Sequence, residues 1–179
     1  LYRPKIPVVY NCGGYEKVET LKMLDGLIDI YLPDFKYMSA DLAARYSHAP
    51  DYPEVAKRAL AEMVRQVGGD QTTFDEDGIM KRGVIVRHLE LPGCIEDSKA
   101  VVRYLYKTYG NNIYISIMNQ YTPMEGIGEK FPELNRKLTE REYDELVDYA
   151  ISIGVENGFI QEGETASESF IPPFTNEGI

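Results

Sequence analysis

Two hydrophobic patterns alternate along this chain. Short runs of apolar, mostly β-branched or aromatic residues predict buried strands, and segments whose apolar residues recur every three or four positions predict amphipathic helices. The predicted strands are residues 7–11, 29–33, 80–91, 112–121 and 158–161, and the predicted helices are residues 16–25, 40–46, 53–67, 97–109 and 139–153. Strands and helices in turn predict βα units and a mainly parallel sheet, either open or closed into a barrel.

Local features mark where several of these elements begin and end. Ser39 is suited to cap the helix that starts at residue 40, and "TERE" at 139–142 matches a capping box. The "DEDG" stretch at 75–78 predicts a hairpin turn that leads from a short strand, residues 71–74, into the strand beginning at residue 80. Residues 122–138 and the tail from residue 163 carry neither pattern, so we interpret them as irregular.

Composition narrows the classes of function. The 179 residues are 44% hydrophobic and 27% charged, and their net charge of -10 argues against nucleic acid or an anionic membrane as partner. No apolar run approaches the roughly 18 residues of a membrane span. The two cysteines, Cys12 and Cys94, form neither a disulfide framework nor a Cys-x-x-Cys metal motif. We therefore expect a cytoplasmic protein.

The stretch "IDIYLPDFKY", residues 28–37, is unusual for a buried strand because it ends in charged residues. Side chains alternate between the two faces of a strand, so Asp34 and Lys36 share the face of Leu32. A carboxylate and an amine at the end of a core strand call for an explanation.

Polar residues also close the other predicted strands. The carboxyl ends of parallel strands meet at one edge of a sheet, where binding sites form. The candidate site residues are Asn11, Asp34, Lys36, Arg87, Asn119 and Gln120. Lys36 and Arg87 can hold a carboxylate, while Asp34 or Asn11 accept hydrogen bonds from an amine or ribose hydroxyl, so the set suits a nucleoside that bears an amino acid.

The alternative to a site is purely structural. Asp34 would then pair with Lys36, and Arg87 with Glu90. His88 alternates to the face opposite Arg87 and is interpreted as a packed or surface residue. Cys12 lies near the predicted site, but no histidine stands beside it in sequence, so we interpret it as a small turn residue rather than a nucleophile.

Four stretches together resemble a known family. They are "PVVYNCGGYEKVETLKMLDGLIDIYLPDFKY", "RYSHAPDYPEVA", "RGVIVRHLELPG" and "YISIMNQYTPM", joined near the end by "ENGFIQEGETASESFIPPF". The chain resembles the radical S-adenosylmethionine proteins related to pyruvate formate-lyase-activating enzyme. The resemblance implies an α/β fold, an incomplete TIM-like (β/α)6 barrel.

In that family a Cys-x3-Cys-x2-Cys loop holds a 4Fe-4S cluster, which cleaves S-adenosylmethionine to a 5'-deoxyadenosyl radical. The cysteines of this chain do not supply the motif. The chain is therefore expected to be the carboxyl-terminal part of such a protein, with about the last four βα units in residues 1–122 and a carboxyl-terminal extension, residues 123–179, packed on them. Alone it is expected to hold no cluster, no catalytic residue and no activity.

The resemblance also assigns roles to the candidate residues. Asp34 and Lys36 match the family's Asp-x-Lys at a strand end, and Arg87 matches the arginine of the next strand, all lining the S-adenosylmethionine pocket. Asn11 falls where the family has a Thr-Asn-Gly turn, although this sequence reads Asn-Cys-Gly-Gly. Asn119-Gln120 stands where the better known activases carry a histidine. Implied partners are a glycyl-radical enzyme or another protein substrate and a flavodoxin-like or ferredoxin-like reductant.

Two other interpretations stay open. One is a non-catalytic nucleoside-binding or adaptor domain with the same fold. The other is a barrel enzyme that uses Lys36 without a metal, as "DFK" is similar to the Asp-x-Lys-x-x-Asp of orotidine-phosphate decarboxylases, although Ser39 stands at the last position. Under the fragment interpretation, missing strands would leave a barrel edge uncovered, and we expect the chain to self-associate there.

Overall fold

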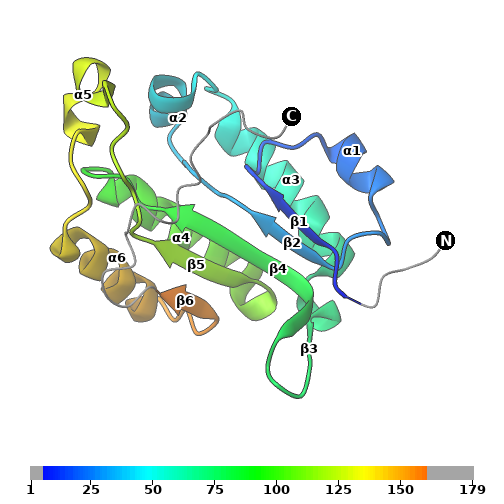
Figure 1. The fold of residues 1–179 in the computed structure, drawn as a ribbon. Helices are drawn as coiled ribbons and strands as arrows, with labels where there is room; N and C mark the ends of the chain where they lie inside the picture. Colours follow the sequence, from blue (N-terminus) through cyan, green and yellow to red (C-terminus); the bar gives the residue numbers. More distant parts are fainter. Residues whose placement is uncertain (1–5, 161–179) are drawn as a thin grey trace.

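The sheet of this protein is parallel except for one short hairpin strand. The structure, a computed structural model, describes residues 6–160. Within them a six-stranded sheet has the order β1-β2-β4-β5-β6, with β3 antiparallel to β4 (Figure 1). The strands are β1 (Val9–Cys12), β2 (Ile30–Pro33), β3 (Thr73–Phe74), β4 (Met80–Leu89), β5 (Tyr114–Met118) and β6 (Gly158–Ile160).

The helices fall into two groups (Figure 1). Packed along the sheet or beside one another are α1 (Val18–Met23), α3 (Tyr52–Val67), α4 (Ile95–Tyr109) and α6 (Glu140–Ser152). Beyond the carboxyl ends of the strands lie α2 (Ala40–Ser47) and α5 (Ile127–Lys130). Short 3-10 helices span Gly69–Gln71, Gly110–Asn112 and Pro132–Leu134.

The core lies between the sheet and the long helices. On the helix-facing side, Tyr31 of β2, Val84 of β4 and Ile115 of β5 are at most 1% exposed. They pack against apolar residues of α3 and α4 such as Met63 and Leu105. Neighbours in sequence point to the opposite side, as expected for strands. Along β4 this puts the buried Val86 on the helix-facing side and Arg87 on the other.

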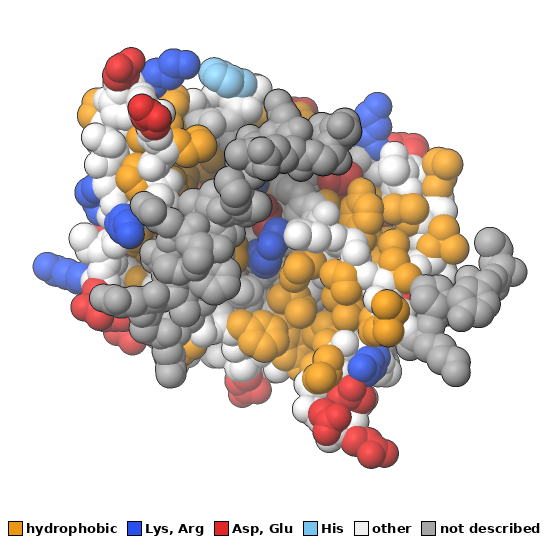
Figure 2. All heavy atoms as spheres, in the orientation of Figure 1, with side chains coloured by type: hydrophobic (Ala, Val, Ile, Leu, Met, Phe, Trp, Pro, Cys, Tyr) orange, Lys and Arg blue, Asp and Glu red, His pale blue; other side chains and the backbone are white. Residues whose placement is uncertain are grey.

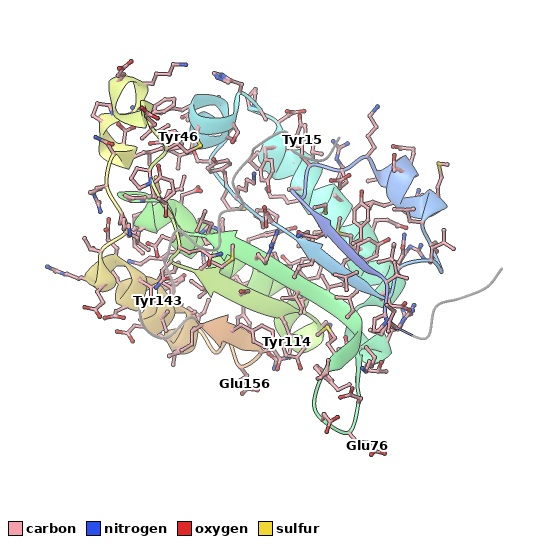
Figure 3. All side chains as sticks on the ribbon, viewed as in Figure 1. Tyr15, Tyr46, Glu76, Tyr114, Tyr143 and Glu156 are labelled. Atoms are coloured by element: carbon pink, nitrogen blue, oxygen red, sulfur yellow. The ribbon has the colours of Figure 1, made fainter. Side chains whose placement is uncertain are left out.

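The opposite face of the sheet is also rich in apolar side chains. Val9 and Phe159 are 51% and 47% exposed, and Figure 2 shows hydrophobic side chains gathered over β1, β2 and β4. We call this side the open face. It continues toward the β3–β4 hairpin, whose turn carries Glu76 at its tip (Figure 3).

The predicted elements are confirmed, with shifted ends. The hairpin turns through Asp75 and Gly78, Ser39 caps α2, and Thr139 with Glu142 forms the capping box of α6. The predicted strands 80–91 and 112–121 were too long, because pairing between β4 and β5 stops at Leu89 and Met118.

The segment interpreted as irregular, residues 122–138, contains α5 and the 3-10 helix Pro132–Leu134. Residues 123–160 belong to the same compact unit as the sheet, since Tyr143 and Leu146 of α6 join the main core. The part of the predicted carboxyl-terminal extension from residue 161 onward lies outside the described residues.

Candidate functional site

Three of the predicted site residues come together because their strands are adjacent and parallel. Asn11 of β1 pairs in register with Leu32 of β2, and an isolated parallel bridge joins Asp34 to Arg87 of β4. All three side chains therefore reach the same edge of the open face. The predicted convergence of these strand ends is present in the structure.

Arg87 connects the three side chains. Its Nη2 atom lies 2.7 Å from Asp34 Oδ1 in an ion pair and donates a 2.7 Å hydrogen bond to Asn11 Oδ1. The alternative pairing of Arg87 with Glu90 was wrong, because alternation along β4 puts these two side chains on opposite faces. Asp34 pairs with Arg87 rather than Lys36, so the second half of that alternative was wrong as well.

A cleft opens beside this ion pair. It has a volume of about 310 Å³ and is lined by Asp34, Lys36, Tyr37, Arg87, Leu89, Leu91 and Met118. One wall is charged and the other is apolar, which is the usual character of a site for a small molecule.

The two cationic side chains of the cleft, Arg87 and Lys36, differ in how far they are free to bind a ligand. The guanidinium of Arg87 is largely neutralised by Asp34, but its Nε atom is buried and has no hydrogen-bond partner within residues 6–160. Lys36 is exposed, and its ammonium makes no ion pair with the described residues. Among the described residues, the cleft thus presents one cation outside any ion pair and one donor without a hydrogen-bond partner, both suited to an anionic or polar ligand group.

Asn119 and Gln120 follow β5 but are not among the described residues that line the cleft. Gln120 Nε2 lies 3.6 Å from the sulfur of Met118, which does line it. The structure therefore places these two beside the site rather than in its wall.

Sequence reasoning overlooked the apolar wall. Leu89 and Leu91 lie two and four positions beyond Arg87 on the same face of the chain, and Met118 is the register partner of Leu89. The alternation rule that selected Arg87 also selects the two leucines, but only the register of β4 against β5 brings in Met118.

The opposite side of β4 buries two titratable groups. His88 is 1% exposed, as expected for a packed residue, and its Nδ1 donates a 2.8 Å hydrogen bond to the carbonyl of Phe35, while burial lowers its pKa to about 4. Glu90 is fully buried, neither of its carboxylate oxygens has a hydrogen-bond partner in the described part of the chain, and burial raises its pKa to about 8.

The cysteines do not resemble reactive or ligating residues. Burial raises the pKa of Cys12 to about 11, which disfavours the thiolate and agrees with its interpretation as a structural residue. Cys94 lies at the start of α4 and its pKa is also raised by burial. Across residues 6–160, no three His, Cys, Asp or Glu side chains are grouped so that they could hold a metal ion.

Comparison with known proteins gives one relative of unestablished function. The chain is 30% identical over 146 residues to the uncharacterized protein MJ0674 of Methanocaldococcus jannaschii, an alignment that covers 81% of this chain and 38% of that protein. The chain thus spans well under half the length of this relative. No protein family and no solved structure matches the chain. Over the described range, no helix is long and apolar enough to cross a membrane.

Proposed function

We propose that this chain is the carboxyl-terminal part of a radical S-adenosylmethionine enzyme related to pyruvate formate-lyase-activating enzyme, and that its cleft contributes to binding S-adenosylmethionine. The observation that carries the proposal is the convergence of Asn11, Asp34 and Arg87 from three neighbouring strand ends, next to Lys36. A merely structural ion pair would not require a cleft with an apolar wall beside it.

The topology is consistent with part of a barrel. The parallel strands follow one another across the sheet in the order of the sequence, β1-β2-β4-β5-β6, and only the hairpin strand β3 lies outside this order. In a barrel successive units advance in one direction and keep their helices on one face, whereas a doubly wound sheet reverses its order and carries helices on both. We infer that the open face is the interior side of an incomplete (β/α)6 barrel.

The cleft fits the cofactor by its donor set. Lys36 suits a carboxylate, the unused Nε of Arg87 suits a hydroxyl or carboxylate oxygen, and Leu89 with Met118 suits an apolar or planar group. When bound to a reduced cluster, S-adenosylmethionine supplies a carbon-centred radical. The described residues do not fit an iron–sulfur cluster, so we assign this chain only the binding and orientation of the cofactor.

The radical formed from the cofactor needs a target and the cluster needs an electron donor. We propose a protein substrate, with a glycyl-radical enzyme as the first candidate, and a flavodoxin-like or ferredoxin-like reductant. A non-catalytic nucleoside-binding or adaptor domain is the alternative, and it makes the opposite prediction for turnover.

The decisive experiment uses the protein made from its full reading frame. Iron and sulfide are reconstituted anaerobically, the protein is reduced in the presence of S-adenosylmethionine, and 5'-deoxyadenosine is measured. We expect product, and we expect Asp34→Ala or Lys36→Ala to lower its rate at least tenfold without loss of iron.

Two surface variants serve as matched controls. Asp148→Ala in α6 and Lys107→Ala in α4 remove the same charges from exposed positions outside the cleft, and they should retain activity. A full reading frame without a Cys-x3-Cys-x2-Cys motif, together with no 5'-deoxyadenosine, would contradict the proposal and favour the adaptor interpretation.

A further inference from the structure

The segment that carries Asp34 and Lys36 is anchored through three consecutive backbone amides. Asp34 N donates to Cys12 O at 2.9 Å, Phe35 N to Arg87 O at 2.8 Å, and Lys36 N to the hydroxyl of Tyr52 at 2.9 Å. The first two acceptors are backbone carbonyls, so they depend on the sheet alone. The third acceptor is a side chain from the start of α3.

Tyr52 also joins this segment to the end of β1. Its hydroxyl lies 3.0 Å from the carbonyl oxygen of Gly13 and 3.1 Å from that of Asp34. Because a phenol has one proton, that proton is shared between the two carbonyls while the oxygen accepts from Lys36 N. One hydroxyl thereby connects the loop that follows β1 to the segment after β2 that carries Asp34 and Lys36.

The ring of Tyr52 is fixed by burial and by contacts with other aromatic rings. The side chain is 3% exposed, stacks on Tyr15 with ring centroids 5.8 Å apart, and meets Tyr37 edge-on at 5.7 Å. Figure 3 shows Tyr15 beside α3. Tyr37 itself lines the cleft, so the aromatic packing reaches the site from the side opposite the open face.

The close approach of the two loops also depends on Gly14. This residue has a φ of +78°, and a Cβ at its position would collide with the carbonyl oxygen of Asp34 and crowd the Tyr52 hydroxyl. A side chain at residue 14 would therefore push the two strand ends apart. Two different residues, Gly14 and Tyr52, thus maintain the same junction.

We propose that Tyr52 is a positioning residue of the cleft, which sets the backbone of Lys36 so that its ammonium meets the anionic part of the ligand. The nature of the ligand in this inference rests on the proposed function, whereas the anchoring of the Lys36 backbone by Tyr52 does not. Lys36 is long and exposed, so its reach is defined by its main chain, and Tyr52 is the side-chain anchor of that main chain.

The geometric part is tested without ligand. Hydrogen exchange at single amides is measured by NMR in the full-length protein and in Tyr52→Phe. We expect the Lys36 amide to exchange about 5- to 10-fold faster, because its acceptor is gone. Tyr31→Phe is the matched control, since it removes another buried hydroxyl hydrogen bond, at 2.7 Å to Gln66. An unchanged Lys36 amide in Tyr52→Phe would overturn the proposal.

The functional part is tested by a double-mutant cycle on binding of S-adenosylmethionine. We expect Tyr52→Phe and Lys36→Gln each to weaken binding about 5-fold, and the double variant to bind no more weakly than Lys36→Gln alone. Multiplying effects would show that Tyr52 acts independently of Lys36 and would overturn its positioning role. A wild-type protein that does not bind S-adenosylmethionine would instead refute the proposed function, and the exchange experiment would still decide the geometry.

Discussion

Arg87 and Asp34 define the charge of the cleft. Their side chains are 26% and 24% exposed, so each charge is largely removed from water and needs its partner more than a surface ion does. Asn11 adds a neutral acceptor to the same guanidinium. The pair therefore stabilises the edge of the sheet and also sets the electrostatic environment of any ligand. Its contribution to stability can be measured without a ligand.

We expect a double-mutant cycle of Asp34→Asn and Arg87→Met to give a coupling free energy of about 1 to 3 kcal/mol in urea unfolding. The control is the pair Glu54 and Lys57 of α3, at 2.8 Å, in which the Glu54 side chain is 72% exposed. It should couple by at most about 0.5 kcal/mol, because solvent screens the carboxylate. Equal coupling in both cycles would contradict the inferred partial burial of the site pair.

Glu90 should make stability depend on pH. Its pKa of about 8 in the folded state lies above the ordinary value of about 4.3 in the unfolded chain, so the folded state binds the proton more tightly. The favourable contribution is complete below the unfolded pKa and is lost progressively as the pH rises toward 8. Glu90→Gln cannot ionise and should gain about 3 kcal/mol relative to wild type between pH 5 and 8.

The measurement is urea unfolding of both proteins across that range, with Glu76→Gln as control. Glu76 lies exposed at the hairpin tip, where the same substitution should leave the pH dependence unchanged. Parallel pH profiles for wild type and Glu90→Gln would show that Glu90 is solvated or paired in solution.

At the scale of elements, the segment after β5 returns to α2. Glu133 Oε1 accepts hydrogen bonds from Arg45 at 2.6 Å and from the Tyr46 hydroxyl at 2.9 Å, and the ring of Phe131 meets Tyr46 edge-on at 5.2 Å. Figure 3 shows Tyr46 on the side of α2 that faces α5. Tyr46 also contacts Tyr37 of the cleft wall, with ring centroids 6.5 Å apart, so Tyr46 links residues 131–133, just after α5, to the site.

We expect Glu133→Ala to free this segment without unfolding the protein. Deuterium uptake over residues 119–135 should become about 3- to 10-fold faster, while the global unfolding free energy falls by about 1 kcal/mol or less. Glu129→Ala, an exposed change within α5 itself, should leave uptake nearly unchanged. Equal deuterium uptake over residues 119–135 in wild type, Glu133→Ala and Glu129→Ala would mean that Glu133 does not hold this segment against α2.

At the scale of the whole molecule, the described sheet has an apolar face and an edge strand. Within residues 6–160, β1 pairs only with β2, and Ile6 and Val9 near or in it are 74% and 51% exposed. An unpaired edge beside exposed apolar side chains favours pairing with another chain. The proposed upstream barrel strands would cover the same surface in a longer protein.

The isolated chain of 179 residues is therefore expected to self-associate. Light scattering after size exclusion should give a mass above 20.4 kDa that rises with concentration, and Val9→Lys should reduce it because a charge on the edge opposes pairing. Met23→Lys, on α1 at a position 79% exposed, is the control and should not. A monomer at high concentration in wild type would contradict this expectation.

The periodicity of the chain by itself determined the types and order of the strands and long helices, because each of them has an apolar pattern that matches one secondary structure. It did not reveal α5 or the 3-10 helix Pro132–Leu134, which are short and carry no periodic pattern. The capping residues Ser39 and Thr139 and the turn at residues 75–78 were readable for the same reason, since they act through bonds to near neighbours in the chain. The alternation rule likewise placed Asp34, Lys36 and Arg87 at strand ends.

Only the tertiary structure decided which of these groups meet. The partner of Arg87 is 53 positions away, its second partner Asn11 is further still, and both are brought in by strand order and register rather than by local pattern. The burial of Glu90 and the junction at Tyr52 were equally hidden, because they arise where α3, α4 and α6 pack against the sheet. Such contacts depend on how far apart the elements lie in space, and the pattern of residues along the chain carries no information on those distances.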